Sequence, residues 1–72
     1  FKHDDNLIKI IENYLLEFGP TNINILVGDI GALAIKHDDI HKAIQFEIGK
    51  GKLSLNPEGK LTLKNYVYTG TN

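Results

Sequence analysis

The stretch DDIHKAIQFEIGKGKLSLNPEGKLTL, residues 38–63, changes its hydrophobic period once, from that of an α-helix to that of a β-strand. In its first part the apolar residues lie three and four positions apart, at Ile40, Ala43, Ile44 and Ile48. This spacing predicts a helix that begins at Asp38 or Asp39, because a short carboxylate caps a helix start. Gly49 and Gly51 are expected to end it, since glycine is the usual residue just past a helix.

The second part of the stretch alternates between apolar and polar residues on both sides of a turn. Leucines alternate with polar residues over 52–56 and again over 60–64. Between these runs, Asn56-Pro57-Glu58-Gly59 has proline at the second position and glycine at the fourth, as turns prefer. The pattern predicts a β-hairpin with one face packed on the helices. The leucines expected on that face are Leu53, Leu55, Leu61 and Leu63.

Two further helices are predicted before this stretch. The first covers residues 5–18 and is stopped by Gly19-Pro20. Its apolar face contains Leu7, Ile8, Ile11, Tyr14, Leu15 and Phe18. The second follows a Thr21-Asn22 cap and is stopped by Gly31. Its apolar residues are Ile23, Leu26, Val27 and Ile30.

The tetrapeptide KHDD occurs twice, at residues 2–5 and 36–39. One interpretation is a metal site, in which His3 or His37 binds with a neighbouring aspartate and His41 helps from four residues further on. No third ligand with firm spacing accompanies them. Aspartate at a helix start also accepts hydrogen bonds from the free N–H groups of the first turn and favours the positive end of the helix dipole. The sequence therefore favours two helix caps, supplied by either aspartate of each copy, over a metal site.

Taken in order, LIKIIENYLLEFGPTNINILVGDIG (residues 7–31) and the stretch 38–63 resemble a winged-helix domain over about residues 5–64. The shared features are a first helix with a Gly-Pro stop, a second helix after a threonine cap, and a third that ends in Lys-Gly before a hairpin. The resemblance implies an α+β fold, a three-helix bundle with a C-terminal β-hairpin wing, as a single domain over residues 1–72. It also implies that the helix at 38–48 is the recognition helix and that the Asn-Pro-Glu-Gly turn is the wing tip.

The end of the recognition helix departs from the winged-helix pattern. Where the family has an aliphatic residue followed by a polar one, this chain has Glu47 followed by Ile48. Either the helix is rotated near its end, or Glu47 is partly buried and paired. Phe46 is then expected to lie toward solvent.

Composition narrows the class of protein. The formal net charge is −1, and all eight basic residues are lysines. This is not the charge of a strong nucleic-acid binder, and the absence of arginine leaves base-specific readout poorly equipped. The chain has no cysteine, and no apolar run approaches the roughly 20 residues that span a bilayer. We expect an intracellular protein, cytoplasmic or nuclear, without a membrane partner. Because the chain begins with Phe1 and lacks methionine, we expect a domain cut from a longer protein.

Candidate contacts lie on the recognition helix and around the hairpin. On a helical wheel, Asp38, His41, Lys42 and Gln45 face away from the core. Gln45 can read adenine, and Lys42 can contact guanine or phosphate. A lysine cluster around the hairpin contains Lys50, Lys52, Lys60 and Lys64. It suits phosphate contact, or it keeps an exposed edge strand from pairing with another chain. The predicted nucleic-acid-binding set is Lys36, His41, Lys42, Gln45, Lys50, Lys52 and Lys60.

We therefore expect a nucleic-acid-binding winged-helix module that binds duplex DNA in transcription or replication control. The alternative is a winged-helix protein–protein interaction module within a larger assembly or a homodimer. The acidic start of the recognition helix, the lack of arginine and the expected exposure of Phe46 favour this alternative. The sequence suggests no nucleophile–base pair and contains no phosphate-binding glycine motif, so we expect neither an enzyme nor a cofactor.

Overall fold

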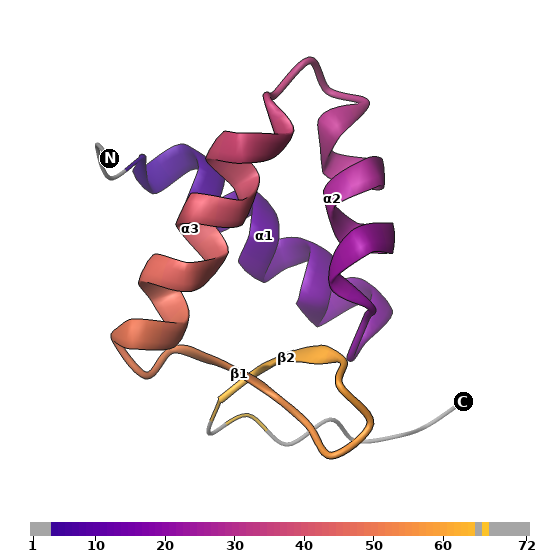
Figure 1. The fold of residues 1–72 in the computed structure, drawn as a ribbon, viewed down its shortest axis with the longest axis vertical. Coiled ribbons are helices and arrows are strands. Elements are labelled where there is room, and N and C mark those ends of the chain that lie inside the picture. The colour runs from indigo at the N-terminus through magenta and orange to yellow at the C-terminus, as the bar shows by residue number, and fades with distance from the viewer. Residues whose placement is uncertain (1–3, 65, 67–72) are drawn as a thin grey trace.

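The computed structural model of the protein describes residues 4–64 and Tyr66. The elements are the helices α1 (Asp5–Phe18), α2 (Ile23–Gly31) and α3 (His37–Gly49) and the strands β1 (Leu53–Leu55) and β2 (Leu61–Leu63). The strands pair antiparallel and lie across the end of the helix bundle at which α3 ends and α2 begins (Figure 1). This is the predicted α+β fold class, three helices followed by a C-terminal hairpin, and it is compatible with a winged helix.

The local signals that bound α1 and α2 act as predicted. The Asp4 carboxylate caps α1 by accepting hydrogen bonds from two backbone N–H groups of the first turn, at 3.0 and 3.3 Å. Gly19 ends α1 with a φ of 76°, which glycine adopts without strain. Asn22 then caps α2, because its side-chain oxygen accepts from the N–H of Asn24 at 2.8 Å. These contacts involve residues close in sequence, so the helix boundaries agree with the prediction.

The start of α3 differs from the prediction. The helix begins at His37, and its N-cap is Lys36, which makes no side-chain cap hydrogen bond. Asp38 and Asp39 lie inside the first turn, so the prediction that one of them caps this helix was wrong. The His37 ring lies against Gly31 of α2, so closely that a Cβ on Gly31 would lie 2.4 Å from its Nε2. The two carboxylates still stabilise α3, because they lie at the positive end of its dipole.

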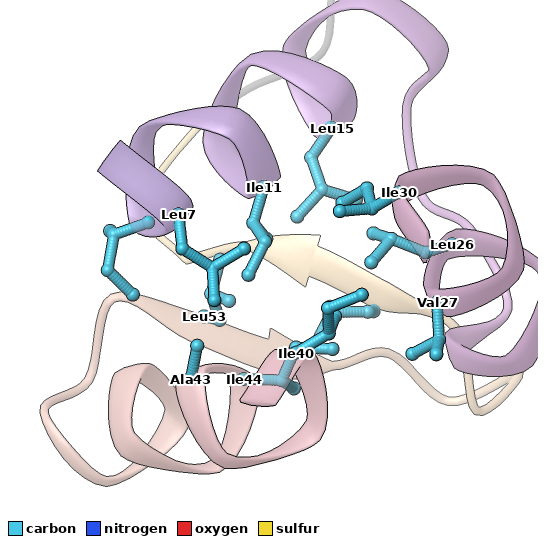
Figure 2. Packing of buried hydrophobic residues seen from close by; sticks show 12 residues of the cluster. Leu7, Ile11, Leu15, Leu26, Val27, Ile30, Ile40, Ala43, Ile44 and Leu53 are labelled. Carbon is cyan, nitrogen blue, oxygen red and sulfur yellow. The ribbon is translucent and has the colours of Figure 1, made fainter. Parts of the chain in front are cut away.

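A cluster of buried side chains joins the helices to the hairpin. Its members are Leu7, Ile8, Ile11, Leu15, Leu26, Val27, Ile30, Ile40, Ala43, Ile44, Leu53 and Leu61. The side chains from all three helices and the sheet point toward one common centre (Figure 2). In a chain of this length the core is thin, so each of these positions contributes a large share of the buried apolar area.

Six of the predicted core residues lie outside the buried cluster: Tyr14, Ile23 and Leu63 are partly buried against it, and three others are exposed. Phe18 is 62% exposed, Leu55 53% and Ile48 36%. Phe18 is the last residue of α1 and Leu55 lies next to the hairpin turn, so both extend past the ends of the packed layer. On α3, Glu47 occupies the inward position that was expected for Ile48. Tyr14 is half-buried at the edge of the cluster.

Hydrogen bonds hold the hairpin on both sides of β2. Leu55 pairs with Leu61 in the ladder. The turn is closed by the Gly59 N–H, which donates to the Asn56 carbonyl at 2.8 Å. On the other side of β2, the Thr21 N–H donates to the Leu61 carbonyl at 3.0 Å, and the Leu61 N–H donates to the Thr21 carbonyl at 2.8 Å. Leu61 therefore lies between two backbone segments, whereas Leu55 lies on the outer strand.

A side-chain hydrogen bond ties α1 to α2. The Tyr14 hydroxyl donates to Asp29 Oδ2 at 2.5 Å. This bond, with smaller contributions from burial and from the carboxylate charge, raises the pKa of Tyr14 from 10.0 to about 12. Since the pKa is higher in the folded than in the unfolded chain, the stabilisation is complete below pH 10.0 and is lost as the pH rises toward about 12.

Replacing Tyr14 by phenylalanine is expected to lower the free energy of unfolding by about 1 kcal/mol at neutral pH, the usual net value of one hydrogen bond. The difference from wild type should shrink above pH 10.0, because the wild-type chain then loses the same bond with its proton. Urea unfolding of both proteins at neutral and alkaline pH measures this. Asp29→Asn is the matched control, since it keeps an acceptor but removes the charge. A difference between Tyr14→Phe and wild type that stays constant with pH would contradict the assignment.

Candidate nucleic-acid interface

Positive charge gathers in the second half of the chain. Residues 36–64 contain six of the eight lysines and four of the nine acidic residues, whereas residues 1–35 contain two lysines and five acidic residues. One of those four acidic residues, Glu47, is buried. The excess positive charge lies in and around the hairpin, where residues 50–64 contain four lysines and one glutamate, although the formal net charge of the chain is −1.

The hairpin face that points away from the helices carries lysines and hydroxyls. Successive side chains of a strand point to opposite faces, and the buried leucines of both strands point into the core. The residues on the opposite face are Lys52, Ser54, Thr62 and Lys64. Ser54 pairs with Thr62 in the ladder, and the Lys64 N–H donates to the Lys52 carbonyl at 3.0 Å. We call these four residues, a cross-strand pair of lysines next to a cross-strand pair of hydroxyl side chains, the outer wing face.

The outer wing face is suited to binding phosphate groups. Lysine and hydroxyl side chains are frequent contacts of phosphate oxygens. Lys52 and Lys64 lie opposite each other, and like charges in this position destabilise a hairpin by up to about 1 kcal/mol. Neither lysine forms an ion pair with another described residue. An anion bound between them would reduce that repulsion.

Lys60 lies beside the hairpin turn, and the carboxylate of Glu58 partly offsets its positive charge. The Lys60 Nζ is 3.9 Å from Glu58 Oε1, and the two side chains are 49% and 74% exposed. An exposed pair of this kind contributes about 0–1 kcal/mol and is screened by salt. Lys60 therefore remains able to bind another anion.

The exposed face of α3 holds most of the other predicted contacts. His41, Lys42 and Gln45 are exposed, as is Asp38 in the first turn, so the predicted outward orientation of these side chains is confirmed. Lys36 lies at the end of α3 that is far from the hairpin (Figure 1). The predicted set therefore divides into Lys36, a group along α3, and the lysines at the hairpin.

The join between α3 and the hairpin has a fixed geometry. Gly51 has a φ of 80°, and its N–H donates to the Ile48 carbonyl at 3.0 Å. The Lys52 N–H donates to the Glu47 carbonyl at 2.9 Å. Together these bonds form the Schellman motif, which satisfies the last carbonyls of a helix. They set the direction in which the hairpin leaves α3.

Phe46 lies at the surface beside this join. Its side chain is 37% exposed, and the Lys50 Nζ is 5.1 Å from the centroid of its ring. A cation over an aromatic face is attracted to it, by about 0.5–1 kcal/mol at exposed sites. The expectation that Phe46 lies toward solvent is confirmed, and the contact keeps the Lys50 charge close to the hairpin.

Glu47 is the anomaly of this region. It is 1% exposed, and neither of its carboxylate oxygens has a hydrogen-bond partner. The inverted order of Glu47 and Ile48 in the sequence correctly points to burial, but the expectation that a buried Glu47 is paired was wrong. Glu47 is buried on α3 together with Ile40, Ala43 and Ile44, and the described residues bring no donor to its carboxylate.

The predicted contact set omits part of the outer wing face. Ser54 and Thr62 are absent from it, and Lys64 belongs to the predicted lysine cluster but not to the contacts. The alternation of apolar and polar residues in the hairpin identifies these residues. Once the leucines are assigned to the buried face, the residues between them must lie on the opposite face.

Among the described residues we find neither a candidate metal site nor a candidate membrane-spanning helix. The described residues contain no group of three or more His, Cys, Asp or Glu side chains that could hold a metal ion. His3, from the first KHDD copy, lies outside the described residues. Across residues 4–64 and 66, no helix combines the length and apolar character needed to cross a bilayer.

The arrangement of α3 and the hairpin is compatible with a winged helix. No protein-family model, curated protein or solved structure matches the chain.

Proposed function

We propose that this protein is an intracellular winged-helix module that binds duplex DNA in transcription or replication control. The observation that carries the proposal is the outer wing face, where Lys52 and Lys64 lie opposite each other beside Ser54 and Thr62. All four side chains can donate hydrogen bonds to phosphate oxygens, and they contribute no negative charge.

In this proposal the hairpin binds the DNA backbone and α3 faces the major groove. Lys42 and Gln45 are the side chains of α3 with suitable donors for base edges or phosphates. Asp38 and Asp39, in the first turn of α3, repel phosphates that pass close to them. The charge therefore favours an orientation in which the end of α3 next to the hairpin lies nearest to the backbone, with little base-specific readout.

The test is a titration of labelled duplex DNA at several salt concentrations with the triple variant Lys52→Gln, Lys60→Gln and Lys64→Gln. Wild type is expected to bind less tightly as salt rises, and the triple variant should lose roughly three phosphate contacts from the salt slope, about 0.9 per contact. Lys9→Gln, on the exposed side of α1, is the matched control and should leave the slope unchanged. Absence of wild-type binding at low salt, or an unchanged slope in the triple variant, would refute the proposal.

The second candidate function is a protein–protein interaction module. The exposed Phe46 ring favours it, since aromatic side chains are enriched in protein interfaces. Phe46→Ala separates the two candidates. Under the DNA proposal this change leaves the DNA affinity within about twofold, because the ring carries no phosphate contact.

A further inference from the structure

The buried carboxylate of Glu47 has no satisfactory state in the structure as described. It occupies the last inward position of α3, with a 1% exposed side chain and no hydrogen-bond partner for either oxygen. As a carboxylate it is a buried charge without a counter-charge, and as a neutral acid it is a buried hydroxyl without an acceptor. Both forms lose the hydrogen bonds that water provides. The free energy of those lost hydrogen bonds favours any arrangement that returns the group to water.

Charged residues on the neighbouring elements do not compensate for burial of the Glu47 carboxylate. The titratable groups on elements packed against α3 are Asp5, Lys9, Glu12, Tyr14 and Glu17 on α1, Asp29 on α2 and Lys52 before β1. None of them hydrogen-bonds the Glu47 carboxylate. Asp29 already accepts from Tyr14. Because the side chain is 1% exposed, hydrating the carboxylate requires the end of α3 or the residues that cover it to move.

The main chain of Glu47 connects this movement to the hairpin. Its carbonyl accepts from the Lys52 N–H at 2.9 Å. The next residue, Leu53, is 1% exposed and begins β1. Opening the last turn of α3 would break this hydrogen bond and pull on Leu53, so hydration of Glu47 by this route also releases the hairpin. Exposure of the Glu47 side chain and detachment of the hairpin from the helices are therefore coupled.

We propose that Glu47 sets an equilibrium between a seated hairpin, as in the structure, and a released hairpin in which the last turn of α3 is open and the carboxylate is hydrated. Released and seated forms differ in the spacing of Lys50 and Lys52 relative to α3. If the proposed DNA binding holds, phosphate on the outer wing face favours the seated form, and Glu47 regulates the affinity of that site.

The experiment is amide hydrogen exchange on the free protein, so it does not depend on DNA binding. In wild type, the N–H groups of Gly51, Lys52 and Lys64 are expected to exchange faster than those of the buried helix residues, because they open locally. In Glu47→Leu the exchange of these three amides should slow by roughly tenfold relative to the core amides, because hydration of a carboxylate no longer favours the released form. Glu47→Gln, which keeps the shape but still lacks partners, should retain most of the gap. Glu58→Gln, a charge change at the exposed turn, is the matched control and should behave as wild type.

Two outcomes would overturn the proposal. One is a wild-type protein in which these three amides exchange no faster than the core amides, because the released form is then absent. The other is a gap that is the same in wild type and Glu47→Leu, because the local opening then has another cause. Comparing wild-type amides with one another needs no variant to fold, and failure of DNA binding would leave either result unaffected.

Discussion

Leu61→Ala is expected to lower the free energy of unfolding by about 2–5 kcal/mol, the range for a large side chain removed from a packed core. Leu61 is 0% exposed, and its backbone bonds to Thr21 hold it in place, so the cavity cannot easily collapse. Small domains have only of the order of 5 kcal/mol in total. The variant should therefore be largely unfolded at ambient temperature, which circular dichroism and urea titration will measure.

The hairpin supplies a matched control for this change. Leu55 is the direct cross-strand partner of Leu61 and presents the same side chain on the same hairpin, but it is 53% exposed. Leu55→Ala should change the free energy of unfolding by no more than about 0.5 kcal/mol. Equal losses in the two variants would mean that the hairpin contributes through strand propensity and not through packing on the helices.

Glu47→Leu is expected to raise the free energy of unfolding by about 1–3 kcal/mol, since leucine has a similar volume and removes two buried oxygens without partners. Urea unfolding at neutral pH measures the change. Few single substitutions stabilise a protein by this amount, because most remove favourable contacts.

The control for Glu47→Leu is Glu58→Leu at the hairpin turn. The Glu58 side chain is 74% exposed, so the same chemical change there should alter stability by no more than about 0.5 kcal/mol. A loss of stability in Glu47→Leu would show that the carboxylate has a favourable partner in solution, and it would remove the reason for a released hairpin.

The sequence predicts the elements of this fold well because their boundaries depend on neighbouring residues. Asp4, Gly19 and Asn22 act on backbone groups within four positions in the chain. The start of α3 is the exception, because the helix begins before the aspartates at His37, whose ring lies against Gly31 on another helix. Such a contact leaves no periodic signal, so Asp38 and Asp39 were assigned the capping role that the local pattern favours.

Burial was harder to predict than secondary structure. Phe18 and Leu55 follow the apolar period correctly, but they lie where the packed layer has already ended. Periodicity gives the face of a residue and not its distance from the end of the core. The exposure of the α3 contacts follows from the period alone, whereas the outer wing face requires the register that pairs Ser54 with Thr62.

The pair of hydrogen bonds between Thr21 and Leu61 also bears on the kinetics of folding. Contacts within and between successive helices involve short loops, which close quickly. The Thr21–Leu61 contact encloses α2, α3 and β1, so most of the chain must be ordered before it forms. The cost of closing that loop is entropic and grows with its length. We therefore expect the docking of β2 to be the rate-limiting event, with Leu61→Ala slowing refolding if that contact is already made in the transition state.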